Sequence, residues 1–158
     1  MHVDATGRFP VKSVRGYSYD LLFYVESSNY IHIELLRDRK ASSYTAAYQR
    51  AFAFFKLHNI PIRIVRLDNE ILSPLLQLFS NLGIRLEIAP PNNHRTLHAE
   101  RHIRTWKNHS IATLATCDPS FPLEAWEYLV PHAECTLNLL RPSAASPKLS
   151  AWEYVCSK

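Results

Sequence analysis

The segment DLLFYVESSNYIHIELL, residues 20–36, contains two runs of β-branched and aromatic residues. Between them, Ser27, Ser28 and Asn29 supply the residue types that favour a turn. This pattern predicts two antiparallel strands joined by a short connection. The apolar-rich opening segment MHVDATGRFP, residues 1–10, predicts a further strand next to them. The chain is therefore expected to begin with three adjacent antiparallel strands.

Helices and strands are expected to alternate after this hairpin. The sequence predicts a helix over residues 41–57, where Tyr44, Tyr48, Phe52 and Phe55 recur at helical spacing and form a stripe for a core or a partner. The later predicted elements are a strand over 60–68, a helix from Ser73 to Gly83, a strand over 84–88, a helix over 96–115, and a helix starting within 118–129 that Pro131 kinks or splits. Residues 141–148 are expected to form a small loop. This order predicts an α/β fold with a mixed sheet flanked by helices.

Composition indicates one globular domain over residues 1–158, because 47% of the residues are hydrophobic. The three cysteines, Cys117, Cys135 and Cys156, contain no C-x-x-C pair, so neither a disulfide framework nor a zinc ribbon is indicated and a reducing compartment is expected. The apolar segments are broken by charges and predict neither a signal peptide nor a membrane span. A net charge of +4 permits nucleic-acid binding.

Residues 89–111, APPNNHRTLHAERHIRTWKNHSI, concentrate histidine and arginine around a single acid, Glu100. On a helix, Arg104 and Lys107 would share a face with Glu100, because they follow it by four and seven residues. In one interpretation Glu100 is a metal ligand at the start of a basic ridge that contacts DNA phosphates. In the other, the face is solvated and Glu100 pairs with Arg104.

A zinc hydrolase is a further reading of this stretch, because His98 and His102 are four residues apart. The order H-A-E-R-H differs from H-E-x-x-H, and on a helix Glu100 would point about 200° away from both histidines. We therefore expect these histidines to be surface or DNA-facing groups.

Three acids are candidates for a shared metal site. Asp4 lies on the first predicted strand, Asp68 ends the fourth, and Glu100 lies in the first turns of the helix over 96–115. If the first and fourth strands are neighbours, the two aspartates meet and the helix can bring Glu100 over them. Two carboxylates about 4 Å apart repel by roughly 4 kcal/mol at an effective dielectric near 20, so three of them require a cation such as magnesium or manganese. The alternative is that each acid is an ordinary turn or surface residue.

The order of several motifs resembles the catalytic core of retroviral and copia-like LTR-retrotransposon integrases. These motifs are VDATGRFP, LDNE, PPNNHRTLHAERHIRTWKNH and the closing segment FPLEAWEYLVPHAECTLNLLRPSAASPKLSAWEYV, which together span essentially the whole chain. The most specific parts are A-E-R at residues 99–101 and the closing pattern T-L-N-x-x-R-P-S.

This resemblance implies an RNase H-like fold with a mixed five-stranded sheet and a DDE-type polynucleotidyl transferase. It implies two Mg²⁺ or Mn²⁺ ions, with Asp4 touching both, Asp68 one and Glu100 the other. The implied reactions are cleavage of element DNA at its 3′ ends and strand transfer into target DNA. DNA would be the partner, the chain would form a homodimer through its first and C-terminal helices, and the nucleus would be the place of action.

The sequence departs from the family pattern in the loop before the catalytic helix. Only 31 residues separate Asp68 from Glu100, whereas the family usually has about thirty-five. The family's Gln-Asn-Gly is replaced by Asn93-His94-Arg95-Thr96-Leu97, which has no glycine. Asn93, His94 and Arg95 are this loop's candidate DNA contacts, together with Arg104 and Lys107 on the helix, and a solvated loop is the alternative.

Two other functions are alternatives to an integrase. A ribonuclease H carries an additional acid on its first helix, and residues 41–57 contain no Asp or Glu. A catalytically inactive, domesticated integrase-like domain would serve DNA binding or protein assembly. The presence of all three acids favours the enzyme.

Overall fold

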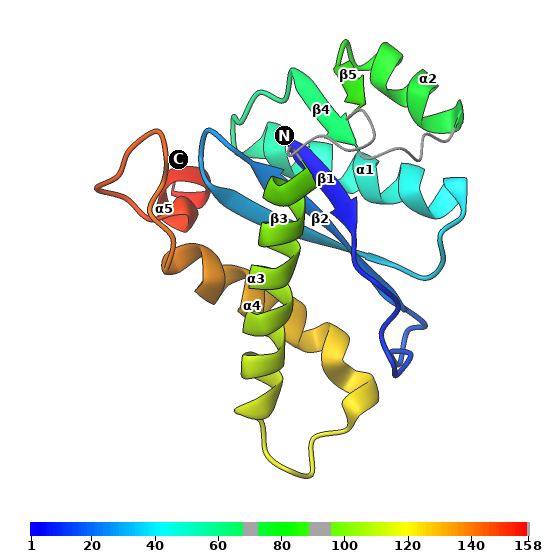
Figure 1. Ribbon diagram of the computed structural model, residues 1–158, viewed down its shortest axis with the longest axis vertical. Helices are drawn as coiled ribbons and strands as arrows, with labels where there is room; N and C mark the ends of the chain where they lie inside the picture. The colour runs from blue at the N-terminus through cyan, green and yellow to red at the C-terminus, as the bar shows by residue number, and fades with distance from the viewer. Residues whose placement is uncertain (68–72, 89–95, 158) are drawn as a thin grey trace.

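The computed structural model describes residues 1–67, 73–88 and 96–157. Figure 1 shows strands gathered into one sheet with helices around it. The described elements are, in chain order, β1 (His2–Ala5), β2 (Tyr19–Val25), β3 (Tyr30–Leu36), α1 (Ala41–Leu57), β4 (Ile64–Leu67), α2 (Ser73–Asn81), β5 (Arg85–Ile88), α3 (Thr96–Ala115), the 3-10 helix η1 (Leu123–Leu129), α4 (Val130–Leu139) and α5 (Ala151–Cys156).

The strands form a mixed five-stranded sheet in the order β3-β2-β1-β4-β5. The first three strands are antiparallel, as predicted, and Asn29 in the β2–β3 turn has a left-handed backbone with φ of 56°. β4 lies parallel to β1, and β5 parallel to β4. Parallel neighbours need crossover connections, which α1 and α2 supply. The predicted α/β fold with a mixed sheet is confirmed.

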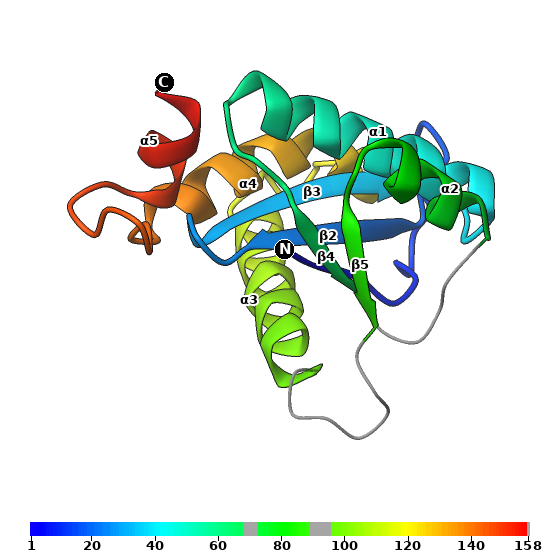
Figure 2. The same cartoon turned by 90° about the horizontal axis from the view of Figure 1, so that it is seen from above.

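Helices cover both faces of the sheet. Successive side chains of a strand point to opposite faces, so each strand contributes to the packing on both sides. One face packs Val3, Leu21 and Phe23 against α1, where Tyr48 and Phe55 are fully buried. The predicted aromatic stripe of α1 therefore belongs to the core. The other face packs the side chains of β2 and β3 against α3, η1 and α4. Figure 2 shows α1 and α3 on opposite sides of the sheet.

Pro131 splits the C-terminal helical region as expected. η1 ends at Leu129, and Pro131 lies in the first turn of α4, where a missing N–H costs no helical hydrogen bond. The short helix α5 was not predicted. It begins with a capping box, in which Ser150 Oγ accepts from Glu153 N and the Glu153 carboxylate accepts from Ser150 N. The sequence S-A-W-E carries this signal.

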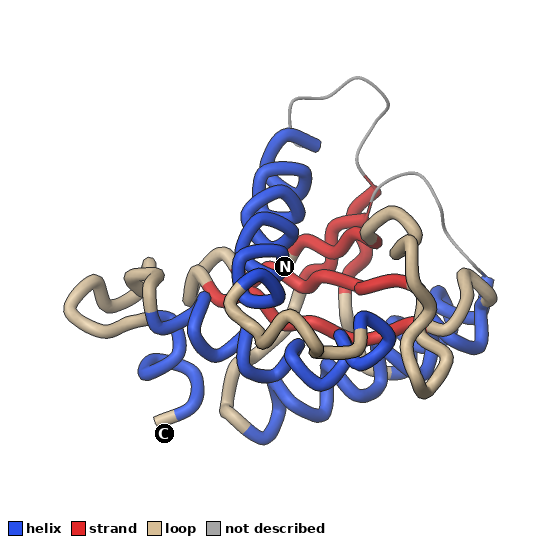
Figure 3. Tube along the Cα trace, turned by 90° about the horizontal axis from the view of Figure 1, so that it is seen from below, coloured by secondary structure: helices blue, strands red, loops and turns tan. Residues whose placement is uncertain are grey.

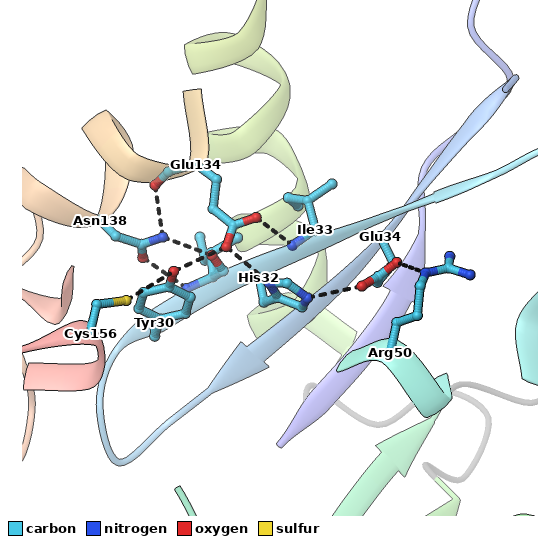
Figure 4. Close-up of polar contacts among 9 residues, drawn as sticks. Tyr30, His32, Ile33, Glu34, Arg50, Glu134, Asn138 and Cys156 are labelled. Carbon is cyan, nitrogen blue, oxygen red and sulfur yellow. Dashed lines mark hydrogen bonds and ion pairs between the residues drawn. The ribbon is translucent and has the colours of Figure 1, made fainter. Parts of the chain in front are cut away.

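The outer edge of β3 is closed by side chains of α4 (Figure 4). Asn138 Oδ1 accepts from Ile31 N at 2.9 Å, and Asn138 Nδ2 donates to Ile31 O at 2.8 Å. Glu134 Oε2 accepts from Ile33 N at 3.0 Å. An edge strand otherwise presents unpaired backbone groups that invite pairing with another chain. Asn138 and Glu134 therefore pair backbone groups of Ile31 and Ile33 and keep this edge from pairing with another chain.

The buried carboxylate of Glu134 is stabilised by contacts with neighbouring side chains. Its Oε1 accepts from Tyr30 Oη at 3.0 Å and lies 2.9 Å from His32 Nδ1, while His32 Nε2 lies 3.2 Å from Glu34 Oε1. Burial lowers the pKa of His32, but Glu134 and Glu34 outweigh this effect and raise it to about 9. A charged imidazole therefore compensates the buried Glu134 at neutral pH.

α3 is attached to β2 by two contacts one helical turn apart. The His102 ring stacks on Tyr24 with ring centroids 3.5 Å apart, and Trp106 Nε1 donates to Asp20 Oδ2 at 2.6 Å. His102 is only 8% exposed, so the expectation that it is a surface or DNA-facing group is wrong. The face of α3 that carries His102 is covered by the sheet. The side chain of His98 lies outside the described part of the structure.

Asp20 is a fully buried acid on an otherwise apolar strand. Burial raises the pKa of its carboxyl to about 7, although the hydrogen bond from Trp106 and the charge of Lys107 act in the opposite direction. Its second oxygen, Oδ1, has no hydrogen-bond partner among the described residues.

Replacing Asn138 by Ala should lower the free energy of unfolding by about 2–4 kcal/mol, because the substitution leaves the buried N–H and C=O of Ile31 unpaired. Urea denaturation measures this loss. Asn108→Ala, at an exposed position on α3, is the matched control and should change stability by about 0.5 kcal/mol or less. Equal losses in the two variants would contradict the edge-closing role of Asn138.

As pH rises, the free energy of unfolding of the unsubstituted chain should fall relative to that of the Asp20→Asn variant. Because the folded state raises the pKa of Asp20, it binds the proton more tightly than the unfolded state, and stability falls between about pH 4 and 7. Asparagine cannot ionise, so the variant escapes roughly 2–4 kcal/mol of this loss. Denaturation at pH 4.5 and pH 8 tests the difference, with Glu124→Gln, at an exposed position on η1, as the control. A pH-independent difference would refute the assignment.

Candidate active site

Asp4 lies on β1, the third strand of the sheet order counted from β3. Its side chain is half-buried, and its Oδ1 accepts a hydrogen bond from Ala5 N at 2.7 Å. Asp4 is paired with Leu22, which packs in the core cluster beneath α3. Because directly opposed residues of an antiparallel pair point to the same face, Asp4 belongs to the α3 face of the sheet.

β1 lies between β2 and β4 in the sheet. The first and fourth strands are therefore neighbours, as the hypothesis of a shared metal site required. The two run parallel, with His2 opposite Arg66 and Val3 opposite Leu67. Asp68 follows Leu67 in the sequence but lies outside the described residues, as do Asn93, His94 and Arg95. The carboxyl ends of parallel neighbours meet at one edge of the sheet, which makes this edge the natural place for a binding site.

α3 brings Glu100 to the same side of the sheet. This helix contacts β1 and β2, and Figure 3 shows it beside the N-terminal end of the chain. Its two anchors on β2, Asp20 and Tyr24, lie on either side of Leu22, the partner of Asp4. Glu100 precedes the buried His102 by two residues, and its own side chain is exposed.

The exposed face of α3 has the predicted composition. Glu100, Arg104 and Lys107 are all exposed, whereas His102 and Trp106 on the opposite side are buried. Within the described ranges, no ion pair joins Glu100 to Arg104. The pair expected in the alternative interpretation is therefore absent, while the solvated face of that interpretation agrees with the exposure of these side chains. The carboxylate of Glu100 is directed to solvent at the start of a cationic ridge.

The described residues alone do not complete a metal centre. Over residues 1–67, 73–88 and 96–157, no three His, Cys, Asp or Glu side chains lie close enough to bind one ion. Asp4 and Glu100 are the two described members of the predicted triad. Both supply carboxylate oxygen, the donor that magnesium and manganese prefer.

A cationic group near the exit of β1 was missed in the sequence. Arg39 Nη2 donates to Thr6 O at 3.1 Å, two residues after Asp4, and the Arg39 guanidinium lies over the Tyr19 ring, 5.1 Å from its centroid. Arg37 lies over Tyr17 at 5.5 Å. Both arginines are exposed. The run R-D-R-K at residues 37–40 carried the signal, but only the fold places it beside the end of β1.

No helix in the described part of the chain is long and apolar enough to cross a membrane. Comparison of the sequence with family models and with curated proteins gives no match.

Solved structures, in contrast, match over nearly the full chain. The catalytic core domain of HTLV-2 integrase, solved in complex with magnesium, superposes with a TM-score of 0.72 at 15% identity, covering 98% of this chain and 93% of that one. A chain of the simian T-cell lymphotropic virus intasome, solved in complex with PP2A regulatory subunit B56 gamma, gives 0.72 at 16% identity, covering 99% and 54%. The catalytic core of BIV integrase gives 0.67 at 14% identity, covering 99% and 92%.

These similarities agree with the strand order and the helical layers described above. At 14–16% sequence identity, these similarities establish the fold of the chain and not its activity. The chain has the RNase H-like fold of a retroviral integrase catalytic core, and the resemblance inferred from its motifs is confirmed at the level of the fold.

Proposed function

We propose that this chain is a DNA integrase catalytic core of the DDE type, a metal-dependent polynucleotidyl transferase that acts on phosphodiester bonds. The observation that carries the proposal is an integrase-core fold in which Asp4 occupies β1 on the face covered by α3, and α3 exposes Glu100. The reactions would be cleavage of element DNA at its 3′ ends and strand transfer of those ends into target DNA.

Asp4, Asp68 and Glu100 would hold two Mg²⁺ or Mn²⁺ ions. The described donors fit such ions, because Asp4 is held at its place on the strand by the N–H of Ala5 and Glu100 is exposed without an ion pair in the described chain. The HTLV-2 core, which shares the fold, was solved with magnesium. When bound, the ions would neutralise charge on the attacking and leaving oxygens.

DNA would run along the exposed face of α3. Arg104 and Lys107 offer cations next to Glu100, and Arg39 adds charge near the exit of β1. Phosphate contacts of this kind position a duplex without reading its sequence. Asn93, His94 and Arg95 precede α3 and are the proposed contacts to the DNA end.

Assembly and place of action are part of the proposal. The HTLV-2 core was solved in dimeric and trimeric forms, which supports an oligomer here. We place the homodimer contact on α1 and on the C-terminal helices α4 and α5. We also propose that the chain acts in the nucleus of a host cell.

Replacing Asp4, Asp68 or Glu100 by the corresponding amide should reduce nicking of a branched DNA substrate in magnesium or manganese by at least about 100-fold, because each change removes a charged ligand. Gel analysis of end-labelled oligonucleotides measures the cleavage. Glu124→Gln, at an exposed position on η1, is the control and should keep full activity. Retained activity in one variant would remove that residue from the site.

The inactive, DNA-binding alternative predicts a different result for the unsubstituted chain. It would bind DNA without metal-dependent nicking, and its melting temperature would not respond to magnesium or manganese. An active core should instead show a thermal upshift with these ions that Asp68→Asn abolishes.

Lys107→Ala should lower the slope of log affinity against log salt concentration by about one unit, as expected for one lost phosphate contact. Fluorescence anisotropy with labelled duplex DNA in EDTA measures the slope without cleavage. Lys56→Ala is the matched control, because Lys56 is exposed on α1, on the opposite side of the sheet. An unchanged slope would assign Lys107 to a solvated surface without a DNA contact.

A further inference from the structure

A cavity of about 360 Å³ lies on the α3 side of the sheet, between the segment that follows β1, the middle of α3, and the η1–α4 region. Its walls are mainly apolar and aromatic, and the principal ones are Phe9, Trp106, Ile111, Leu114, Trp126 and Leu129. Phe9 and Trp126 stack on each other with ring centroids 4.3 Å apart. A volume of this size falls in the range of sites that bind small organic molecules.

Two buried polar atoms without partners belong to this cavity. Asp20 and Ser110 both line it, and neither Asp20 Oδ1 nor Ser110 Oγ has a hydrogen-bond partner within the described residues. Asp20 is completely buried, and its Oδ2 is already occupied by the indole N–H of Trp106. Buried polar atoms are normally hydrogen-bonded, and leaving one unpaired costs about 1–3 kcal/mol. The unsatisfied pair therefore indicates a place for a hydrogen-bonding group from outside the chain.

The charges around the cavity restrict that group. Above about pH 7, where the Asp20 carboxyl is ionised, its Oδ1 requires a donor. Lys107 and Arg8 also line the cavity and would repel an ammonium or amidinium group. An uncharged N–H or O–H satisfies both conditions. The aromatic and aliphatic walls require the remainder of the ligand to be apolar.

We propose that this cavity is a binding site for a compact, uncharged aromatic molecule with one N–H or O–H donor, whose ring packs among Phe9, Trp126 and Leu129 and whose donor binds Asp20 Oδ1. This proposal does not depend on the proposed DNA chemistry, although Lys107 belongs to both surfaces. The ligand would contact Trp106 and Lys107 on α3, the helix that also presents Glu100, and would thereby connect this site to the candidate active site through one rigid element.

Indole and 1-methylindole are suitable probes, because they have nearly the same shape and only indole has the N–H donor. Proton–nitrogen NMR spectra of the full chain resolve the tryptophan side-chain N–H groups. Indole should shift the signals of Trp106 and Trp126 in a saturable way and leave Trp152 unchanged, since Trp152 does not line the cavity. The affinity for 1-methylindole should be at least about 10-fold weaker, as expected for a lost hydrogen bond.

Two variants test the position of the probe. Asp20→Asn should weaken indole binding by about 10-fold or more, because it replaces a carboxylate with an amide that offers a donor at one of its two positions. Ile111→Trp should block the cavity without disturbing the core, because Ile111 is 66% exposed. Leu139→Trp, also at an exposed position but away from the cavity, is the matched control.

The proposal is overturned if indole gives no saturable shift up to millimolar concentration, which would mean that the cavity holds only water. Equal affinities for the two probes would remove Asp20 as the binding group. Binding that survives both Asp20→Asn and Ile111→Trp would place the probe elsewhere on the surface.

Discussion

The hydrogen bond from Trp106 to Asp20 fixes the helix on which the candidate active site depends. A buried carboxylate is costly unless it is paired or protonated, and here one oxygen is satisfied by the indole N–H at 2.6 Å. One turn earlier, His102 stacks on Tyr24. Two contacts a turn apart set both the position and the rotation of α3. With that rotation fixed, Glu100 and its neighbouring cations must face solvent on the other side of the helix.

The same arrangement explains why a single helix serves stability and function without conflict. The covered side of α3 carries the aromatic and imidazole rings that belong to the core, and the uncovered side carries one acid followed by cations. The carboxylate offers an oxygen ligand for a divalent ion, and the two cations that follow it offer contacts to a phosphate backbone. The cavity next to Asp20 lies on the border between these two sides, since both the buried Trp106 and the exposed Lys107 line it.

At the other end of the sheet, α4 stabilises the edge strand β3. Glu134 and Asn138 supply the hydrogen bonds that the edge strand β3 lacks, and His32 balances the buried carboxylate. An unprotected β3 would be open to pairing with another chain. The motif T-L-N in the closing part of the sequence therefore has a physical reason, since its asparagine pairs both backbone groups of Ile31.

Sequence alone was sufficient for the hairpin, the order of strands and helices up to α4, the aromatic stripe of α1 and the split at Pro131, because these follow from local periodicity and turn chemistry. It also placed Glu100, Arg104 and Lys107 on one helical face. It could not determine which face the sheet would cover, and so it assigned His102 to the surface. Only the tertiary structure brings Asp20 to Trp106 and Arg39 to the end of β1. Contacts between distant segments depend on how whole elements pack, and they leave no periodic signal in the chain.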